Sequence, residues 1–391
     1  MDPARAKRSS WLNDQRVRGL VYQTLLLAGI AALACAAIYN AVTNMRARGI
    51  PMGFGFWNDV AGFDINLHLI SYSNLSTYGQ AFWVGLLNTL LIAVICIPLA
   101  TLLGFVVGVA RLSPNWLLSR FALVYTSVMR NTPPLLLLLF WYNAVLKSLP
   151  GPRQSISIGD VVFLNNRGLY LPMPVARNSA VWFLGAVLMA IALTIGLRLW
   201  ARRRQDRTGA QTPTALVAVA LILGLPAVVI AATGPPFTFN IARLSGFNLQ
   251  GGLPVIPEMA ALVFGLVTFT AAFIAETVRA GVLAVPAGQS EAAGALGLHR
   301  GLSMRLVVIP QAMRLITPPL TSQYLNIVKN SSLAVFIGYP DLVQIFAGTV
   351  LNQTQAAVQV MAITMGVYLV ISLAVATALN AFNARYALKG R

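Results

Sequence analysis

Apolar runs long enough to cross a lipid bilayer recur along the whole chain and constrain its fold more than any other feature. A helix needs about 20 consecutive apolar residues to cross the hydrocarbon core. The expected spans cover about 20–42, 82–110, 121–146, 180–199, 214–233, 257–284, 316–345 and 356–383. Backbone groups inside a bilayer must hydrogen-bond within their own segment, so helices are the expected form. The sequence predicts an all-α integral membrane protein with about eight transmembrane helices, the third and seventh of which tilt, kink or contain a turn because their runs are long.

Composition excludes the main soluble classes. Of the 391 residues, 57% are apolar and 10% are charged, whereas a soluble domain carries about 25% charged residues. Both cysteines, Cys35 and Cys96, sit inside apolar runs, and with only two histidines, His68 and His299, a disulfide framework or structural metal site is not expected. The first apolar run continues past Cys35 to about Val42, which is too long for a cleaved signal. It is read as a permanent span.

The placement of Lys and Arg predicts the orientation. Basic residues accumulate in cytoplasmic loops of membrane proteins. With the N-terminus inside, the inner segments hold Arg5, Lys7, Arg8, Arg16, Arg18, Arg111, Arg120, Arg202, Arg203, Arg204, Arg207, Arg300, Arg305, Arg314, Arg385, Lys389 and Arg391. The outer segments hold Arg46, Arg48, Lys147, Arg153, Arg167, Arg177 and Arg243. Seventeen against seven predicts that both termini are cytoplasmic. The net charge of +18 therefore reflects topology, and no nucleic-acid partner is expected.

No catalytic motif is visible. The chain contains no GxxxxGK[ST] phosphate loop, no HExxH and no GxSxG. We therefore expect neither an enzyme nor a chain that binds ATP, a metal or another cofactor itself. Transport, channel and scaffold functions remain.

A small, polar, glycine-spaced segment, 285–315, separates two apolar runs and is expected in the cytoplasm. Ser290 is a candidate N-cap, with Glu291 favourable to the helix dipole, and Gly297 a candidate helix end. Ala293 and Gly297 lie four residues apart and so share one face, where small side chains let another backbone approach. A second short helix is expected from Ser303 toward Ile309, disturbed by Pro310. On spacing alone, a docking element and an amphipathic interfacial loop without a partner are equally supported.

The order of residues in this loop resembles a known family. Glu291-Ala292-Ala293, three residues, Gly297, nine residues, and then Val307-Val308-Ile309-Pro310 resemble the EAA loop of ABC importer permeases, with Val307 where Ile is usual. Further matches to the polar amino acid uptake permeases are Glu276-Thr277-Val278-Arg279-Ala280-Gly281, Pro286-Ala287-Gly288-Gln289, Pro310-Gln311-Ala312-Met313-Arg314, Lys329-Asn330-Ser331-Ser332-Leu333 and Arg130-Asn131-Thr132-Pro133-Pro134. The long general L-amino acid and glutamate/glutamine/aspartate permeases are the most similar subgroup. The resemblance implies that the loop couples to a separate ATPase through Gln289, Glu291, Ala292, Ala293, Gly297 and Pro310.

The resemblance also implies a division of the chain. It covers the five spans of an ABC type I permease core and leaves three additional spans. The expected parts are a cytoplasmic N-terminal segment 1–19, an added helix and periplasmic loop 20–81, core 82–146, an insertion 147–256 with two added helices, core 257–383 with the coupling loop 285–315, and a cytoplasmic end 384–391.

Polar residues within the spans are candidates for function because they are costly in a bilayer. Lys329, with Asn330, Ser331 and Ser332, faces either a central pathway or a packing partner. Glu276 and Arg279 are three apart and are read as a structural ion pair, which could also position the coupling loop.

The run Arg130-Asn131-Thr132-Pro133-Pro134 predicts a helix break, because proline cannot continue a helix. Thr132 could cap a new helix whose partly positive N-terminus, with Arg130, suits an amino acid carboxylate; a gate hinge and an interfacial anchor are the alternatives. Asn88 and Thr89 could contact substrate, although helix–helix hydrogen bonding is favoured. Gly104 and Gly108 form a GxxxG and predict close helix packing.

Together these features favour the permease subunit of an ATP-driven importer for polar L-amino acids in a bacterial inner membrane. The family implies alternating access, an ATPase dimer that binds ATP and Mg²⁺, a second permease subunit, expected as a heterodimer partner, and a periplasmic amino acid binding protein. The alternatives are an ion-coupled secondary amino acid transporter, for which we find no inverted repeat, and a membrane scaffold without a pathway.

Overall fold

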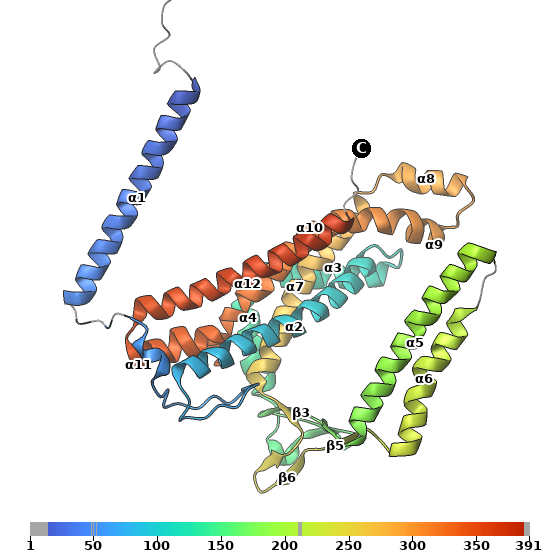
Figure 1. Ribbon diagram of the computed structural model, residues 1–391, viewed down its shortest axis with the longest axis horizontal. Coiled ribbons are helices and arrows are strands. Elements are labelled where there is room, and N and C mark those ends of the chain that lie inside the picture. The colour runs from blue at the N-terminus through green and yellow to red at the C-terminus, as the bar shows by residue number, and fades with distance from the viewer. Residues whose placement is uncertain (1–14, 48, 50, 52, 210–212, 387–391) are drawn as a thin grey trace, which may run out of the picture. The chain divides into compact units, whose positions relative to one another are not determined.

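The computed structural model describes residues 15–47, 49, 51, 53–209 and 213–386 (Figure 1). Arg5, Lys7, Arg8, Arg48, Lys389, Arg391 and most of the expected terminal segments 1–19 and 384–391 lie outside the described residues.

Helices make up most of the described chain. They are α1 (Gln15–Ala47), α2 (Tyr78–Arg111), α3 (Trp116–Asn131), α4 (Pro134–Leu139), α5 (Ser179–Thr208), α6 (Thr214–Thr233), α7 (Pro257–Leu283), α8 (Ala287–Ala295), α9 (Arg300–Ser303), α10 (Ile309–Asn330), α11 (Leu351–Thr354) and α12 (Ala357–Tyr386). Short 3₁₀ segments are η2 (Gly55–Asn58), η4 (Pro152–Gln154) and η6 (Ser331–Ile337), and π-helical segments are η3 (Phe140–Leu146), η5 (Met304–Val308) and η7 (Val343–Val350).

Within the described residues, six helices are long and apolar enough to span a bilayer: α1, α2, α5, α6, α7 and α12. The other two expected spans are each built from shorter segments. The run 121–146 breaks between α3 and α4 at Thr132 and Pro133, and the run 316–345 is divided among α10, η6 and η7. Gly338, with φ of +77°, ends η6. The interruptions expected in the third and seventh runs are therefore present.

The insertion 147–256 adds short strands to the helical fold, which the sequence did not predict. They are β1 (Ile156–Ile158), β2 (Val162–Asn165), β3 (Gly168–Leu171), β4 (Met173–Ala176), β5 (Phe237–Asn240), β6 (Arg243–Ser245), β7 (Asn248–Gln250) and β8 (Leu253–Val255). All pair antiparallel, in the sheet β1-β2-β3-β8, the hairpin β6-β7 and the pair β4-β5, whose strands are separated in sequence by α5 and α6. Strands of three or four residues carry too little periodicity to be recognised in sequence.

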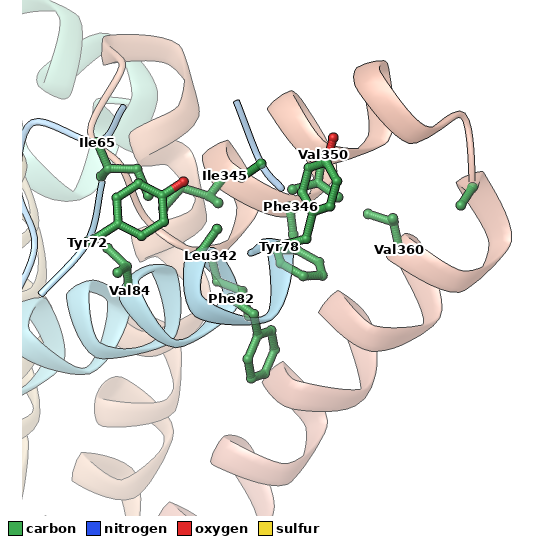
Figure 2. Close-up of a cluster of buried hydrophobic side chains, with 13 residues drawn as sticks. Ile65, Tyr72, Tyr78, Phe82, Val84, Leu342, Ile345, Phe346, Val350 and Val360 are labelled. Carbon is green, nitrogen blue, oxygen red and sulfur yellow. The ribbon is translucent and has the colours of Figure 1, made fainter. Parts of the chain in front are cut away.

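The chain divides into two compact units, one within 1–90 and 340–377 and the other within 91–339 and 378–391. The core of the first unit is aromatic and aliphatic (Figure 2): Tyr78, Phe82 and Val84 of α2 meet Leu342, Phe346 and Val350 from near and within η7, and Val360 of α12. The Tyr72 hydroxyl donates to the carbonyl of Phe63 at 3.1 Å. Burial, and next the charge of Asp64, raise the pKa of Tyr72 to about 12, so this phenol remains a donor.

The second unit is organised by close contact of α7 with its neighbours. A Cβ atom at Gly104 or Gly108 of α2 would lie 2.5 Å from Ile274 or 2.8 Å from Val278, both on α7. The close helix packing predicted from the GxxxG is therefore confirmed. Gly281 lets Ile316 of α10 approach in the same way, since an added Cβ would lie 2.3 Å from its side chain.

Candidate functional site

Three arginines from three helices converge on one carboxylate in the second unit. Glu276 of α7 accepts hydrogen bonds from Arg111, at the end of α2, and from Arg279, one turn along α7, at 2.5 Å. Arg130, in the last turn of α3, is 3.8 Å from the same carboxylate, and its guanidinium lies 5.5 Å from the centre of the Phe273 ring. We call these four charged residues the Glu276 cluster.

The predicted pair of Glu276 and Arg279 is thus confirmed but is part of a larger assembly. Three cations share one anion in this cluster. Their attraction to Glu276 holds the ends of α2 and α3 beside α7, just before the loop that follows α7. Arg130 belongs to this cluster. Its predicted contact with an amino acid carboxylate stays a prediction.

The helix break at Pro133 is present, but the capping prediction for Thr132 is wrong. Thr132 ends α3, and its hydroxyl donates 2.8 Å back to the carbonyl of Val128 instead of capping the next helix. Pro133 occupies the N-cap position of α4, and Pro134 is its first residue. Proline suits that position because its missing N–H has no partner in the first turn of a helix.

The loop 285–315 forms two helical segments, as expected, with different caps. α8 begins at Ala287 after Pro286, so Ser290 lies inside it and is not the cap. Gly297, with φ of +79°, ends the turn after α8, as predicted, and the amide of Leu298 donates to the carbonyl of Ala293 at 3.1 Å. This is the left-handed helix end that glycine favours.

The second segment starts earlier than expected and does not stop at Pro310. His299 caps α9, accepting from the amide of Leu302 at 3.4 Å, while Ser303 lies buried within the segment. The chain stays helical through η5 into α10, where Pro310 occupies the first turn. The wide turns of a π-helix remove the clash between the proline ring and the preceding carbonyl, which explains why the helix continues.

The face of small residues expected to be open to a partner is partly covered within the loop itself. Ala293 is 3% exposed, and α8 packs on α9 and η5. Gln311 of α10 donates to the side-chain oxygen of Gln289 at 3.1 Å. Outward, the loop presents Glu291, Ala292 and Leu296, which is 82% exposed.

The exposed surface of α10 includes a row of polar residues. Ser322, Asn326 and Lys329 follow each other at spacings of four and three, and all are exposed; we call them the α10 polar stripe. Every ion pair among the residues that the structure describes involves Glu276, so none neutralises Lys329. The predicted packing carboxylate for Lys329 is therefore not found in that part of the chain.

The residues after Lys329 are held by local bonds. The hydroxyl of Ser331, fully buried, donates to the carbonyl of Val328 at 2.7 Å, and that of Ser332 to the carbonyl of Lys329 at 2.7 Å. Asn330 is partly exposed. Their predicted contact with substrate stays a prediction.

Asn88 and Thr89 are buried in the first unit, where they hold backbone. Asn88 donates to the carbonyls of Leu67 and Pro340, each at 2.8 Å. The hydroxyl of Thr89 accepts from the amide of Leu342 at 3.1 Å. The favoured prediction was hydrogen bonding between helices, but Asn88 binds two loop carbonyls and Thr89 binds the amide just before η7. Both side chains are closed to solvent in this conformation, and their predicted contact with substrate stays a prediction.

Comparison with known proteins decides the class. The family model for binding-protein-dependent transport system inner membrane components matches residues 100–387, most of the chain. This chain belongs to that family. It is a permease subunit of an ABC transport system, and the matched residues include α8 and α9.

Full-length relatives agree. The permease is 50% identical over 375 residues to the permease protein YhdX of Escherichia coli, covering 96% of this chain and 95% of that protein. It is 46% identical over 382 residues to the general L-amino acid transport system permease protein AapQ of Rhizobium johnstonii, covering 98% and 95%. It is 37% identical over 423 residues to the glutamate/glutamine/aspartate/asparagine transport system permease protein BztB of Rhodobacter capsulatus, covering 100% and 99%.

Three residues of the permease were missed by sequence reasoning. Arg111 was counted only as a loop charge, and nothing in sequence links it to Glu276, 165 positions away. Leu296 was given no role in the predicted loop, beside the helix end at Gly297, although it is 82% exposed. Asp341 is fully buried, where its carboxylate accepts from the amide of Gln344 at 2.8 Å and from the hydroxyl of Tyr368 at 3.1 Å. An Asp just before a helical run is a recognisable capping signal, so Asp341 could have been predicted.

Among the described residues, no three His, Cys, Asp or Glu side chains gather where they could hold a metal ion.

Proposed function

We propose that this permease is the membrane-spanning subunit of an ATP-driven importer for polar L-amino acids, located in a bacterial inner membrane with both termini in the cytoplasm. Family membership supports the transport role, and relatives named for L-amino acids or for glutamate, glutamine, aspartate and asparagine support the substrate class.

The observation that carries the proposal is the α10 polar stripe. The exposed faces of α1, α5 and α6 are lined with Leu, Ile and Val, as a lipid-facing surface requires. An exposed lysine on a membrane helix is costly against lipid and is expected to face water or another subunit. The α10 polar stripe therefore fits the wall of a polar pathway, completed by a second permease subunit, which we propose to be a different chain.

Lys329 is the charge that would select an amino acid on this path. An ammonium group attracts the carboxylate that every amino acid carries, and Asn330 and Ser332 lie beside it to donate or accept hydrogen bonds. Arg130 and Thr132 are proposed as a second contact, and Asn88 and Thr89 as supports of the path.

The loop 285–315 is proposed as the coupling element for a separate ATPase dimer that binds ATP and Mg²⁺. Glu291, Ala292 and Leu296 would contact that subunit, while Ala293, Gly297 and Pro310 shape the loop and Gln289 ties it to α10. An exposed leucine at the tip of a compact loop is the kind of anchor that fills a pocket on a partner. A periplasmic amino acid binding protein would deliver the substrate on the opposite side.

Reconstituted transport tests the proposal. The permease is expressed with its neighbouring transport genes, the complex is purified and identified, and uptake of labelled amino acids into proteoliposomes is measured with and without ATP. We expect co-purification of an ATPase and a second permease, and uptake that requires ATP.

Matched variants separate the path from the coupling. Lys329→Met should reduce uptake at least tenfold while leaving basal ATP hydrolysis intact, because one charged hydrogen bond to a carboxylate contributes about 1.5–3 kcal/mol. Arg198→Met removes an exposed cation of α5, outside both the α10 polar stripe and the loop 285–315, so this variant is the control and should transport normally. Leu296→Glu should instead release the ATPase. Uptake that proceeds without any ATPase and collapses with an ion gradient would favour a secondary transporter, and normal uptake by Lys329→Met together with Arg130→Met would favour a scaffold.

A further inference from the structure

A dense group of arginines occupies the end of α5, in the hairpin that is additional to the permease core. Arg202, Arg203, Arg204 and Arg207 follow one another within six residues, with Asp206 as the only acid. We call these four the arginine patch. α5 remains helical to Thr208, and the four side chains are all exposed.

Two tryptophans place α5 in the bilayer. Trp182 and Trp200 are 69% and 52% exposed, and tryptophan prefers the two interfaces of a membrane. They are 18 residues apart along one continuous helix, which corresponds to about 27 Å at 1.5 Å per residue. That span is close to the hydrocarbon thickness of about 30 Å, so the tryptophans mark both edges of the apolar layer.

The arginine patch then lies at the depth of the lipid headgroups. Its members follow Trp200 by two to seven residues, or about 3–10 Å along the axis. The headgroup region extends roughly 5–8 Å beyond the hydrocarbon on each side. The guanidinium of Arg204 lies 5.3 Å from the centre of the Trp200 ring, which keeps it near the interface.

The described part of the α5–α6 hairpin provides little counter-charge to the patch. Within residues 179–209 and 213–233, which the structure describes for this hairpin, no carboxylate forms an ion pair with the patch, and the described ion pairs all involve Glu276 instead. Placement on the cytoplasmic side explains which way the hairpin was inserted. That placement alone gives the four guanidinium groups no partner of opposite charge in the folded protein.

We propose that the arginine patch binds the phosphate groups of anionic phospholipids and so anchors the α5–α6 hairpin in the membrane. Guanidinium pairs with phosphate through two parallel hydrogen bonds, which gives strong and oriented contacts. α5 and α6 pack along each other (Figure 1), with the small residues Ala186 and Ala190 of α5 and Ala218 of α6 buried. The hairpin exposes apolar side chains on its other faces, so lipid is the partner that surrounds it.

The depth of the arginine patch in the membrane favours lipid over a protein partner. A soluble ATPase docks beyond the headgroups, and the candidate element for that contact is the loop 285–315. The patch ends within about two helical turns of the interfacial tryptophan, and its first members lie at the level that phosphates themselves occupy.

Lipid retention tests the proposal on the full transporter. The complex is reconstituted in phosphatidylcholine with a minor fraction of phosphatidylglycerol, extracted gently, and its bound lipids are quantified by mass spectrometry. The test variant replaces all four patch arginines by glutamine. We expect its phosphatidylglycerol to fall at least about fivefold relative to phosphatidylcholine, since each basic residue near an anionic surface is worth a factor of about five.

Two variants of equal size control for this change. Lysine at all four patch positions keeps the charge and should retain most of the phosphatidylglycerol. Glutamine at the four exposed outer-loop arginines Arg153, Arg167, Arg177 and Arg243 should leave retention unchanged. Added inorganic phosphate should not displace the lipid, since the proposal commits to headgroups held in a membrane. Orientation of the hairpin is checked by labelling Ala215→Cys in a Cys35→Ala background with a membrane-impermeant maleimide.

Either of two results would overturn the proposal: equal phosphatidylglycerol retention in the glutamine variant with the hairpin correctly oriented, or loss of the ATPase from that variant while lipid retention is unchanged. The second result would assign the patch to a protein contact.

Discussion

Gly108→Ala should loosen the packing of α2 on α7, because no room exists there for a methyl group. The added Cβ would lie 2.8 Å from the Cβ of Val278 and 2.9 Å from the carbonyl oxygen of Ala275. Ordinary contact begins at 3.4 Å, so the closer of these two contacts is about 0.6 Å too short and the helices must separate by about that distance at this point. Neither neighbour can yield alone, because one is backbone and the other is a β-branched side chain with a fixed rotamer.

The free energy follows from two opposing effects. Forcing a methylene-sized group into a packed interior costs about 1–3 kcal/mol. Alanine is intrinsically better than glycine in a helix by up to about 1 kcal/mol, although a helix that stays formed in the membrane gains less. We expect a net loss of stability of about 1–2 kcal/mol.

Gly196→Ala is the matched control. Gly196 lies in the middle of α5, and an added Cβ there meets no atom within 4 Å. This substitution should be neutral or stabilise by at most about 1 kcal/mol. Both variants are measured by reversible unfolding in mixed micelles, with thermal stability of the purified permease as a second reading.

A difference of less than about 0.5 kcal/mol between the two variants would refute the packing argument, because surface substitutions scatter by that amount. Loss of stability in both variants would show that glycine matters for a reason other than helix approach.

Three further predictions rest on single contacts. Glu276→Gln leaves three guanidinium groups without their shared anion and should destabilise the permease by about 1–3 kcal/mol, less than the loss of a fully buried pair because solvent reaches the cluster. The control is Asp206→Asn, which removes an exposed acid beside arginines and should change the melting temperature little. Equal effects of the two substitutions would contradict the role of the cluster. Thr89→Val removes the acceptor for the Leu342 amide and should cost about 1–3 kcal/mol, so an unchanged denaturation midpoint would argue against that hydrogen bond. Gly297→Ala forces a left-handed backbone on alanine at about 1–2 kcal/mol and should weaken ATPase co-purification, whereas unchanged binding would mean that the turn is not needed for docking.

Much of this protein was determined by local sequence signals. The apolar runs determined α1, α2, α5, α6, α7 and α12, because a bilayer accepts only segments that satisfy their own backbone. Prolines 133 and 134 determined the break between α3 and α4, and Gly297 the end of the α8 turn, since these two residue types restrict or extend backbone geometry without help from distant contacts. The order of residues in 285–315 was sufficient to recognise the family.

Other features required the tertiary structure. Ser290 and Ser303 are good caps by composition, yet Pro286 precedes α8 and His299 caps α9, because packing of the loop on itself outweighs the modest energy of a cap. Only the folded chain shows that Ala293 is turned inward and Leu296 outward.

The Glu276 cluster is the clearest case of tertiary control. Arg111 and Arg130 lie 165 and 146 positions from Glu276, and each by itself reads as an interfacial charge. What brings them to one carboxylate is the close approach of α2 to α7, which the glycines of α2 allow, and the break after α3. Sequence shows which groups are charged, but electrostatic energy depends on separation and solvent exposure, and both are set by how the helices pack.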